Sequence, residues 1–272
     1  MLFRSIAVLA GTVKPDAPIT RVANAEDAVL QAYRQAKESL AALRPPEPSA
    51  EGDKPAPRKP VRRDPSTAKE VERLEGDVEA LQARLVQTRL MVAGAWFEKA
   101  RAFAEGSKEW QAALEESTKR YKELADKYPT LGGGALARCS EGRNLALLGR
   151  RKQAVEVLAP LVALEEKSAL AVMLRAKALA TSLECWLEDE DYAAFDESLR
   201  DVAIDAPKQL RGVPETDRLA LKYRAAAMLR AQAAALPPAE AAKGRPLLAA
   251  AGKLALEVAK TNRDFAARSE EH

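Results

Sequence analysis

The chain has 272 residues, of which 47% are hydrophobic but only 5% are aromatic. Its apolar residues are mainly alanine and leucine, and good helix formers fill nearly every segment, so sheets are disfavoured and an all-α fold is predicted. Lysine and arginine number 43 against 40 acidic residues, and the two signs are interleaved. A net charge of +3 in that pattern is typical of solvated helix faces and disfavours a nucleic acid partner.

The N-terminal segment, residues 1–44, contains one predicted helix. We expect this helix to begin at Asn24, whose side chain can accept a hydrogen bond from the first turn. Residues 4–13 hold a short apolar run that is compatible with a remnant signal segment or a truncation point, and Ile6 to Val13 is compatible with a short strand. The compartment, cytoplasmic or extracytoplasmic, stays open. No run approaches the ~18 apolar residues of a membrane span.

Residues 45–65 are predicted to form an extended, solvated linker. The stretch is rich in proline and in charged residues of both signs. Two functional alternatives are compatible with the sequence of this linker. Pro45 to Pro48 has the spacing of a proline-rich docking motif, and Lys54 to Arg63 could contact nucleic acid, although adjacent aromatic residues are missing.

Residues 66–106 are predicted to form one long helix with coiled-coil character. Apolar residues recur there at alternating spacings of three and four, as in a heptad seam. The seam consists of Val71, Leu74, Val78, Leu81, Leu85, Thr88 and Val92. This pattern allows two arrangements: an intramolecular hairpin with the helix at 24–44, or a homodimer through residues 66–105.

Residues 107–262 read as successive helical hairpins, followed by a tail at 263–272 that is compatible with truncation of a longer array. Ser107 and Ser168 are predicted helix caps, and Gly149 is predicted to end a helix. Further turns are expected at Glu188 to Asp191, and both Pro237-Pro238 and Gly244 to Pro246 are predicted to lie between the last two helices. The helix after Ser168 is apolar on two sides, as expected for a helix packed between neighbours.

The hairpin from Leu136 to Glu166 has the most regular pattern. Its first helix carries a strip of small residues, and its second helix is amphipathic. The positions that carry a family resemblance are Gly142, Leu145, Leu148, Gly149, Ala154 and Leu158. They resemble the tetratricopeptide repeat (TPR), in which small residues on both helices allow close crossing.

The repeat spacing is longer than is usual for that family. The offset is 37 residues from Tyr121 to Leu158 and 38 from Gly142 to Ala180, against about 34 in the family. The resemblance extends at most over residues 90–260 and implies a TPR-like α-solenoid. The same region of the chain also resembles large bacterial proteins built of many divergent repeats, whose roles are mostly assembly and tethering.

No catalytic motif was found in the sequence. The single histidine is the C-terminal His272, which leaves no histidine-based general base or metal site, and no cofactor motif is present. Gly132 to Gly134 precedes a helix but lacks the companions of a phosphate loop, so we interpret it as a turn. Cys139 and Cys185 fall on apolar faces and are predicted to be core thiols. We therefore predict that the protein is not an enzyme.

The predicted function is a protein–protein interaction scaffold that presents a TPR-like groove to a protein or peptide partner. In such hairpins the first helix lines the inner surface, which makes Arg138, Arg143 and Arg175 the candidate contact residues. Arginine suits an acidic or carboxylate-bearing segment. The alternative is a coiled-coil oligomerisation or spacer protein that acts through residues 66–105.

Overall fold

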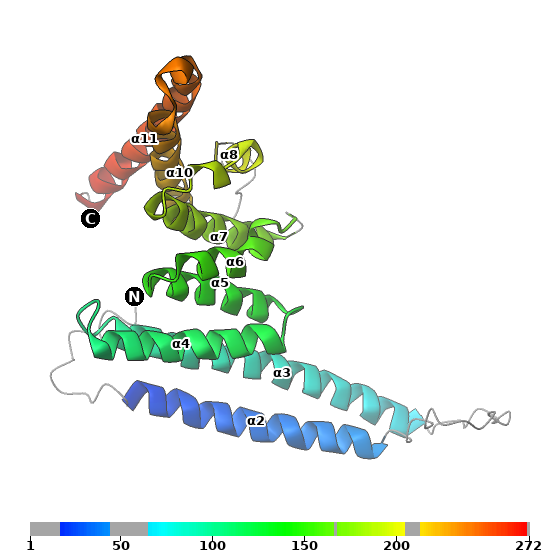
Figure 1. Ribbon diagram of the computed structural model, residues 1–272. Coiled ribbons are helices and arrows are strands. Elements are labelled where there is room, and N and C mark those ends of the chain that lie inside the picture. The colour runs from blue at the N-terminus through cyan, green and yellow to red at the C-terminus, as the bar shows by residue number, and fades with distance from the viewer. Residues whose placement is uncertain (1–16, 44–64, 166–167, 205–212, 271–272) are drawn as a thin grey trace, which may run out of the picture. The chain divides into compact units, whose positions relative to one another are not determined.

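The computed structural model describes residues 17–43, 65–165, 168–204 and 213–270 of the chain (Figure 1). Every regular element within these ranges is helical, which confirms the predicted all-α class. The chain divides into two compact units, residues 1–113 and 114–272. The predicted strand at 6–13 and the predicted linker, apart from Pro65, lie outside the described residues.

The first unit contains an antiparallel helical hairpin made of α2 (Ala17–Leu43) and α3 (Pro65–Ala100). Near one end of the hairpin, Leu40 packs with Val71 and Leu74. Toward the other end, Arg89 Nε donates a hydrogen bond to Glu26 Oε1 at 2.9 Å. The coiled-coil seam therefore has a partner within the chain, as in the intramolecular alternative.

The helix boundaries of this unit differ from the prediction. α2 begins at Ala17 instead of Asn24, and Pro18, whose fixed φ suits a first helical turn, immediately follows its first residue. α3 ends at Ala100, short of the predicted 106. Gly106 has φ +79° in the connection that follows, so the chain changes direction there.

α4 (Lys108–Lys127) crosses the boundary between the two units and is followed by a helical hairpin, α5 (Gly132–Leu147) and α6 (Arg151–Val162). Ser107 Oγ accepts a hydrogen bond from the backbone N–H of Trp110 at 3.1 Å, which confirms the predicted cap. Gly149, with φ +75°, follows α5 as predicted. The turn predicted at Gly132 to Gly134 is wrong, because α5 begins there. A Cβ on Gly134 would collide with the carbonyl of Tyr128, so this close approach requires glycine.

The remaining α-helices are α7 (Ala169–Glu188), α8 (Glu197–Ile204), α10 (Glu215–Ala235) and α11 (Ala241–Glu270). Short 3-10 turns, η1 (Tyr192–Ala194) and η2 (Pro238–Glu240), precede α8 and α11. Ser168 Oγ caps α7 by accepting from the Ala171 N–H at 3.1 Å, as predicted.

The predicted break at Gly244 to Pro246 is wrong, because these residues lie inside α11. Pro246 removes one backbone donor only a turn and a half from the helix start, so most of the helical hydrogen-bond pattern is kept. The turn runs through Pro237 and η2, as predicted for Pro237 and Pro238. The backbone is helical as far as Glu270, so most of the predicted tail continues the helix.

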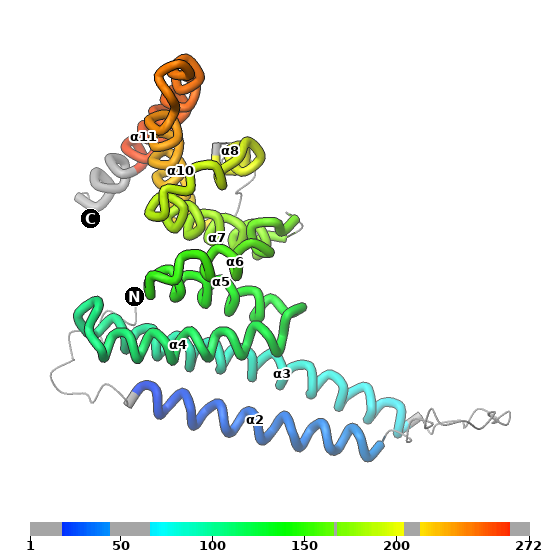
Figure 2. The backbone as a smooth tube through the Cα atoms, in the orientation of Figure 1, coloured from blue at the N-terminus to red at the C-terminus, as the bar shows by residue number. Residues whose placement is uncertain are grey.

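Hydrogen bonds between neighbouring helices show that they run back and forth (Figure 2). From α4 to α5, the sequence separation of bonded residues falls from 35 for Arg150 and Glu115, through 27 for Asn144 and Ser117, to 12 for Arg138 and Asp126. A separation that shrinks toward the connecting turn defines an antiparallel pair. The same decrease occurs between α6 and α7, from 37 to 13.

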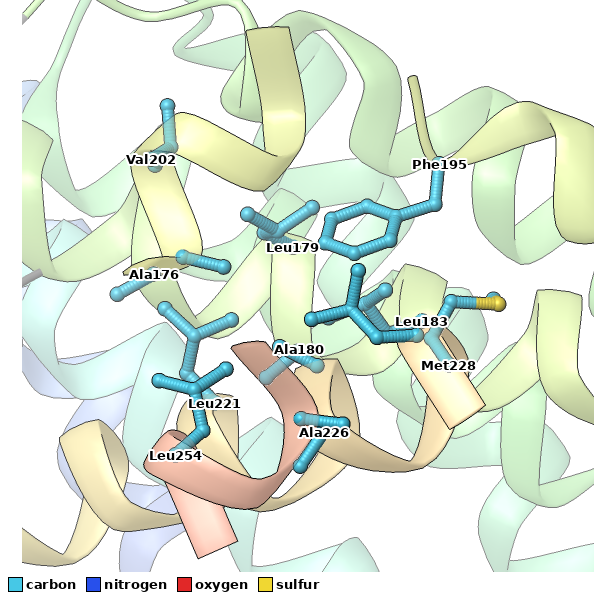
Figure 3. Close-up of a cluster of buried hydrophobic side chains, with 14 of the residues drawn as sticks. Ala176, Leu179, Ala180, Leu183, Phe195, Val202, Leu221, Ala226, Met228 and Leu254 are labelled. Atoms are coloured by element: carbon cyan, nitrogen blue, oxygen red, sulfur yellow. The ribbon is translucent and has the colours of Figure 1, made fainter. Parts of the chain in front are cut away.

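The largest core of the second unit lies between α7, α8, α10 and α11 (Figure 3). Phe195, Leu179 and Leu183 are fully buried in it. α7 also contributes Leu174 and Ala178 to a separate cluster with α5 and α6. α7 is therefore buried on two sides, as its sequence pattern predicts.

Both cysteines are free and buried, which confirms the prediction of core thiols. Burial raises the pKa of Cys139. Burial, followed by the nearby Glu184 and Asp189, raises the pKa of Cys185 to about 11. The thiolate is the reactive form, so only a small fraction of Cys185 is reactive at pH 8.

We expect a thiol reagent such as dithionitrobenzoate to react very slowly with the native protein at pH 8. Both thiols should then react at once in concentrated guanidinium chloride, because unfolding removes the burial that suppresses the thiolates. Absorbance of the released nitrothiobenzoate measures both rates. Rapid reaction of either thiol in the native protein would contradict the described burial of the cysteines.

Candidate partner-binding surface

α5, α7 and α10 lie side by side and run in the same direction, with α7 in the middle. Lys177 Nζ lies 3.2 Å from Asp217 Oδ2, and Arg224 Nη2 lies 2.7 Å from Glu184 Oε2. Both pairs join residues 40 positions apart, and a constant separation identifies α7 and α10 as parallel. Buried contacts give a similar offset between α5 and α7, since Leu145 clusters with Cys185.

The three helices expose side chains along one shared surface, which we call the parallel-helix surface. It consists of Ser140, Arg143 and Leu147 on α5, Lys177, Thr181 and Glu184 on α7, and Ala220, Tyr223, Arg224 and Ala227 on α10. Tyr223 is 66% exposed and borders the face of α10 that carries Asp217 and Arg224. An exposed aromatic side chain beside charged groups is the type of residue that dominates many protein interfaces.

The structure places the three predicted arginines in different settings. Arg138 Nη2 donates to Asp126 Oδ1 at 3.3 Å, and Arg175 Nε donates to the carbonyl of Val162 at 3.0 Å. Arg138 thus links α5 to α4, and Arg175 links α7 to the C-terminal end of α6. Arg143 is exposed on α5, so it is the predicted residue that belongs to the parallel-helix surface.

Charged groups of both signs lie near Cys139, where α5 meets α7. Lys177 and Arg143 both lie close enough to Cys139 to oppose the effect of burial on its pKa. Sequence reasoning missed Lys177 and Tyr223 because each looks like an ordinary helix-surface residue. For Lys177, the signal that could have found it is the repeat offset, which places Cys139, Lys177 and Asp217 at successive steps of 38 and 40 residues.

The acidic run predicted as a turn, Glu188 to Asp191, begins at the last residue of α7 and is tied to α6. Arg151 forms ion pairs with Glu188 and with Asp189, the latter at 3.3 Å. Glu190 has φ +56° in the turn itself. This cross-link fixes the end of α7 against the start of α6.

Polar side chains fill part of the contact between α4 and α5. Asn144 Nδ2 donates to Ser117 Oγ at 3.0 Å, and both residues are fully buried. Glu141 is only 4% exposed on the same helix. Burial raises the pKa of Glu141 above its ordinary value of 4.5, against the opposing fields of Lys122 and Arg138.

Glu141→Gln is expected to stabilise the protein at pH 7, because ionised Glu141 is penalised in the folded state. Above pH 4.5 the folded chain holds this proton more tightly than the unfolded chain does, so stability falls as pH rises through the raised pKa. The advantage of the variant should therefore vanish below pH 4.5. Urea unfolding across this pH range measures it.

Glu123→Gln is the matched control for that experiment. Glu123 is exposed on α4, so its replacement removes the same charge without removing a buried carboxylate. Equal effects of the two substitutions at every pH would contradict the argument from the burial of Glu141.

Among the described residues, no group of three or more His, Cys, Asp or Glu side chains is placed to hold a metal ion. None of the helices within the described ranges has both the length and the apolar character needed to cross a membrane.

Comparison with protein-family models, with curated proteins and with solved structures finds no match to this chain.

Proposed function

We propose that this protein is a TPR-like α-solenoid that acts as a protein–protein interaction scaffold. The observation that carries the proposal is the constant offset of 40 residues in the ion pairs between α7 and α10. Together with the similar offset between α5 and α7, it supports a repeating unit of two helices in which the first helices line one surface. Close crossing at Gly142 and Leu158 supports the same interpretation.

The partner is an acidic or carboxylate-bearing segment of a protein, which the parallel-helix surface binds. Arg143 supplies a bidentate donor for a carboxylate, and Tyr223 supplies a rigid apolar area with a polar tip. Lys177 and Arg224 of the same surface form ion pairs with Asp217 and Glu184, so their charges are already partly balanced. Binding, rather than catalysis, is the role of this surface.

The alternative function, self-association through residues 66–105, has less support. Val71 and Leu74 of the seam are buried against Leu40 of the same chain. A coiled-coil dimer would have to open this hairpin. Sedimentation at increasing concentration tests it: a dimer that becomes monomeric in the Leu74→Asp, Leu81→Asp variant would favour this alternative over the scaffold.

The proposal is tested by affinity capture from the source cells with the full chain and an Arg143→Glu, Tyr223→Ala variant. We expect the wild-type chain to retain a protein whose affinity for the double variant is at least about 30-fold lower. This is the typical loss for two central interface residues. Quantitative mass spectrometry of the captured proteins measures this loss.

Lys152→Glu is the control, because Lys152 is exposed on α6 and the change reverses a charge away from the parallel-helix surface. Circular dichroism must show that all three proteins are equally folded. If every captured protein is retained equally by the wild-type chain and the double variant, the parallel-helix surface is not the binding site.

A further inference from the structure

The last helix, α11, is apolar on two opposite sides, and one of these sides is uncovered. Leu254 and Ala251 are buried in the core against α7 and α10. On the opposite side, Leu248 is 52% exposed and Leu256 is 56% exposed. Single exposed leucines are common, but this pair lies two turns apart on one helix with small apolar residues between them, and a continuous exposed apolar patch marks an interaction site.

The shape of the uncovered side allows another helix to pack closely against it. Gly252 lies between Leu248 and Leu256, and a Cβ at Gly252 would meet no atom within 4 Å. Within the second unit, Gly142 of α5 receives Leu158 of α6 in a comparable position. We call the uncovered side of α11 the outer stripe, and it consists of Leu248, Ala249, Gly252, Ala255, Leu256 and Ala259.

Among the residues of α11 whose side chains the structure describes, the exposed charges at the start and along one edge of the outer stripe are positive. They are Arg245, Lys253 and Lys260. Glu257 lies farther round the helix and pairs with Lys222 of α10 at 2.7 Å, so its charge is neutralised. An occupant with carboxylates along its edges would gain favourable interactions with all three cations.

We propose that the outer stripe of α11 binds an amphipathic helix of another protein whose apolar face is flanked by acidic residues. The two leucines pack into the grooves between the side chains of that helix, and Gly252 lets the two backbones approach closely. The three cations favour a helix whose apolar face is flanked by acidic side chains. This site is separate from the parallel-helix surface and does not depend on the proposed function.

A second copy of this chain is a poorer occupant on the same evidence. Two α11 helices packed through their outer stripes would bring Arg245, Lys253 and Lys260 of both copies to one interface. Like charges placed together oppose association. The charge pattern therefore favours a partner of opposite sign over self-association.

The test uses the full chain and two synthetic helical peptides that share one leucine and alanine stripe. One peptide carries glutamates beside the stripe and the other carries lysines. We expect the acidic peptide to bind at least tenfold more tightly than the basic one, as measured by fluorescence anisotropy of the labelled peptides. The double variant Lys253→Glu, Lys260→Glu should reduce or reverse this preference. The double variant Leu248→Asp, Leu256→Asp should weaken binding of the acidic peptide at least tenfold.

Lys152→Glu is the control, because Lys152 is exposed on α6 and lies outside the outer stripe, and it should leave binding of the acidic peptide unchanged. Failure of the acidic peptide to bind, or equal binding of both peptides, would overturn the proposal. Sedimentation of the chain alone completes the test. A dimer that is lost in the Leu256→Asp variant would also overturn it, because a second copy would then occupy the outer stripe.

Discussion

Gly142→Leu is expected to lower the free energy of unfolding by about 3 kcal/mol, the upper part of the range for overpacked cores. A Cβ at Gly142 would lie 2.5 Å from Cδ2 of Leu158, well inside ordinary van der Waals contact. Leu158 is fully buried between α5, α6 and α7, so it has no free space into which it could move. Urea unfolding followed by circular dichroism measures the change.

Two further variants make this prediction specific. Gly252→Leu places the same substitution at an open position of α11, where the better helix propensity should add up to about 1 kcal/mol. Leu158→Ala, combined with Gly142→Leu, should destabilise less than the sum of the two single changes, because the new leucine fills the space left by the old one. Additive losses would show that α5 and α6 do not cross at this point.

Phe195→Ala is expected to lower the free energy of unfolding by about 3–5 kcal/mol, the usual cost of removing a buried phenylalanine ring. Phe195 is fully buried, and its ring lies among Leu179, Leu183 and Met228 (Figure 3). Its carbonyl also accepts a hydrogen bond from Gln232 Nε2 at 2.8 Å, which holds the backbone in place around the cavity. Thermal and urea unfolding measure the loss.

Tyr223→Ala provides the control for the loss of an aromatic ring. Tyr223 is exposed, so its truncation should change stability by less than about 0.5 kcal/mol. Phe195→Leu should keep most of the packing and lose about 1 kcal/mol. A loss for Phe195→Ala no larger than that for Tyr223→Ala would contradict the core between α7 and α10.

Local signals in the sequence predicted much of the fold. Ser107 and Ser168 cap helices as expected, because a serine hydroxyl accepts from the N–H groups of a helix start whatever the tertiary context. Gly149 takes the left-handed conformation that its position requires. The two apolar sides of α7 correctly predicted that neighbours cover both of them.

Other features depend on tertiary contacts that no local pattern records. The residues from Gly244 to Pro246 look like a turn, yet Leu247, Ala251 and Leu254 pack on the core and keep this stretch helical. Arg138, Arg143 and Arg175 were predicted as candidate contact residues, and the sequence did not show that Arg138 bonds to Asp126 of α4 or that Arg175 bonds to the carbonyl of Val162. The rotation of a helix about its own axis decides which partners its polar side chains reach. Apolar periodicity determines that rotation only coarsely.

The buried polar groups were also beyond local prediction. Gln232 occupies a position in the apolar strip of α10, where its amide donates to the carbonyl of Phe195. Glu141 and Asn144 are buried between α4 and α5. A sequence pattern classifies these residues as polar and hence exposed, because it does not show which backbone or side-chain groups of neighbouring elements can form hydrogen bonds with them.

The most direct test of the scaffold function is site-specific photo-crosslinking in the source cells. A photoreactive phenylalanine analogue is placed in turn at Leu147, Thr181 and Tyr223 on the parallel-helix surface, and at Gln153 and Glu156 on α6. We predict that the three surface positions crosslink to the same protein and that the α6 positions do not. Adducts that form only from α6, or no adduct from any position on the parallel-helix surface, would contradict the proposed function.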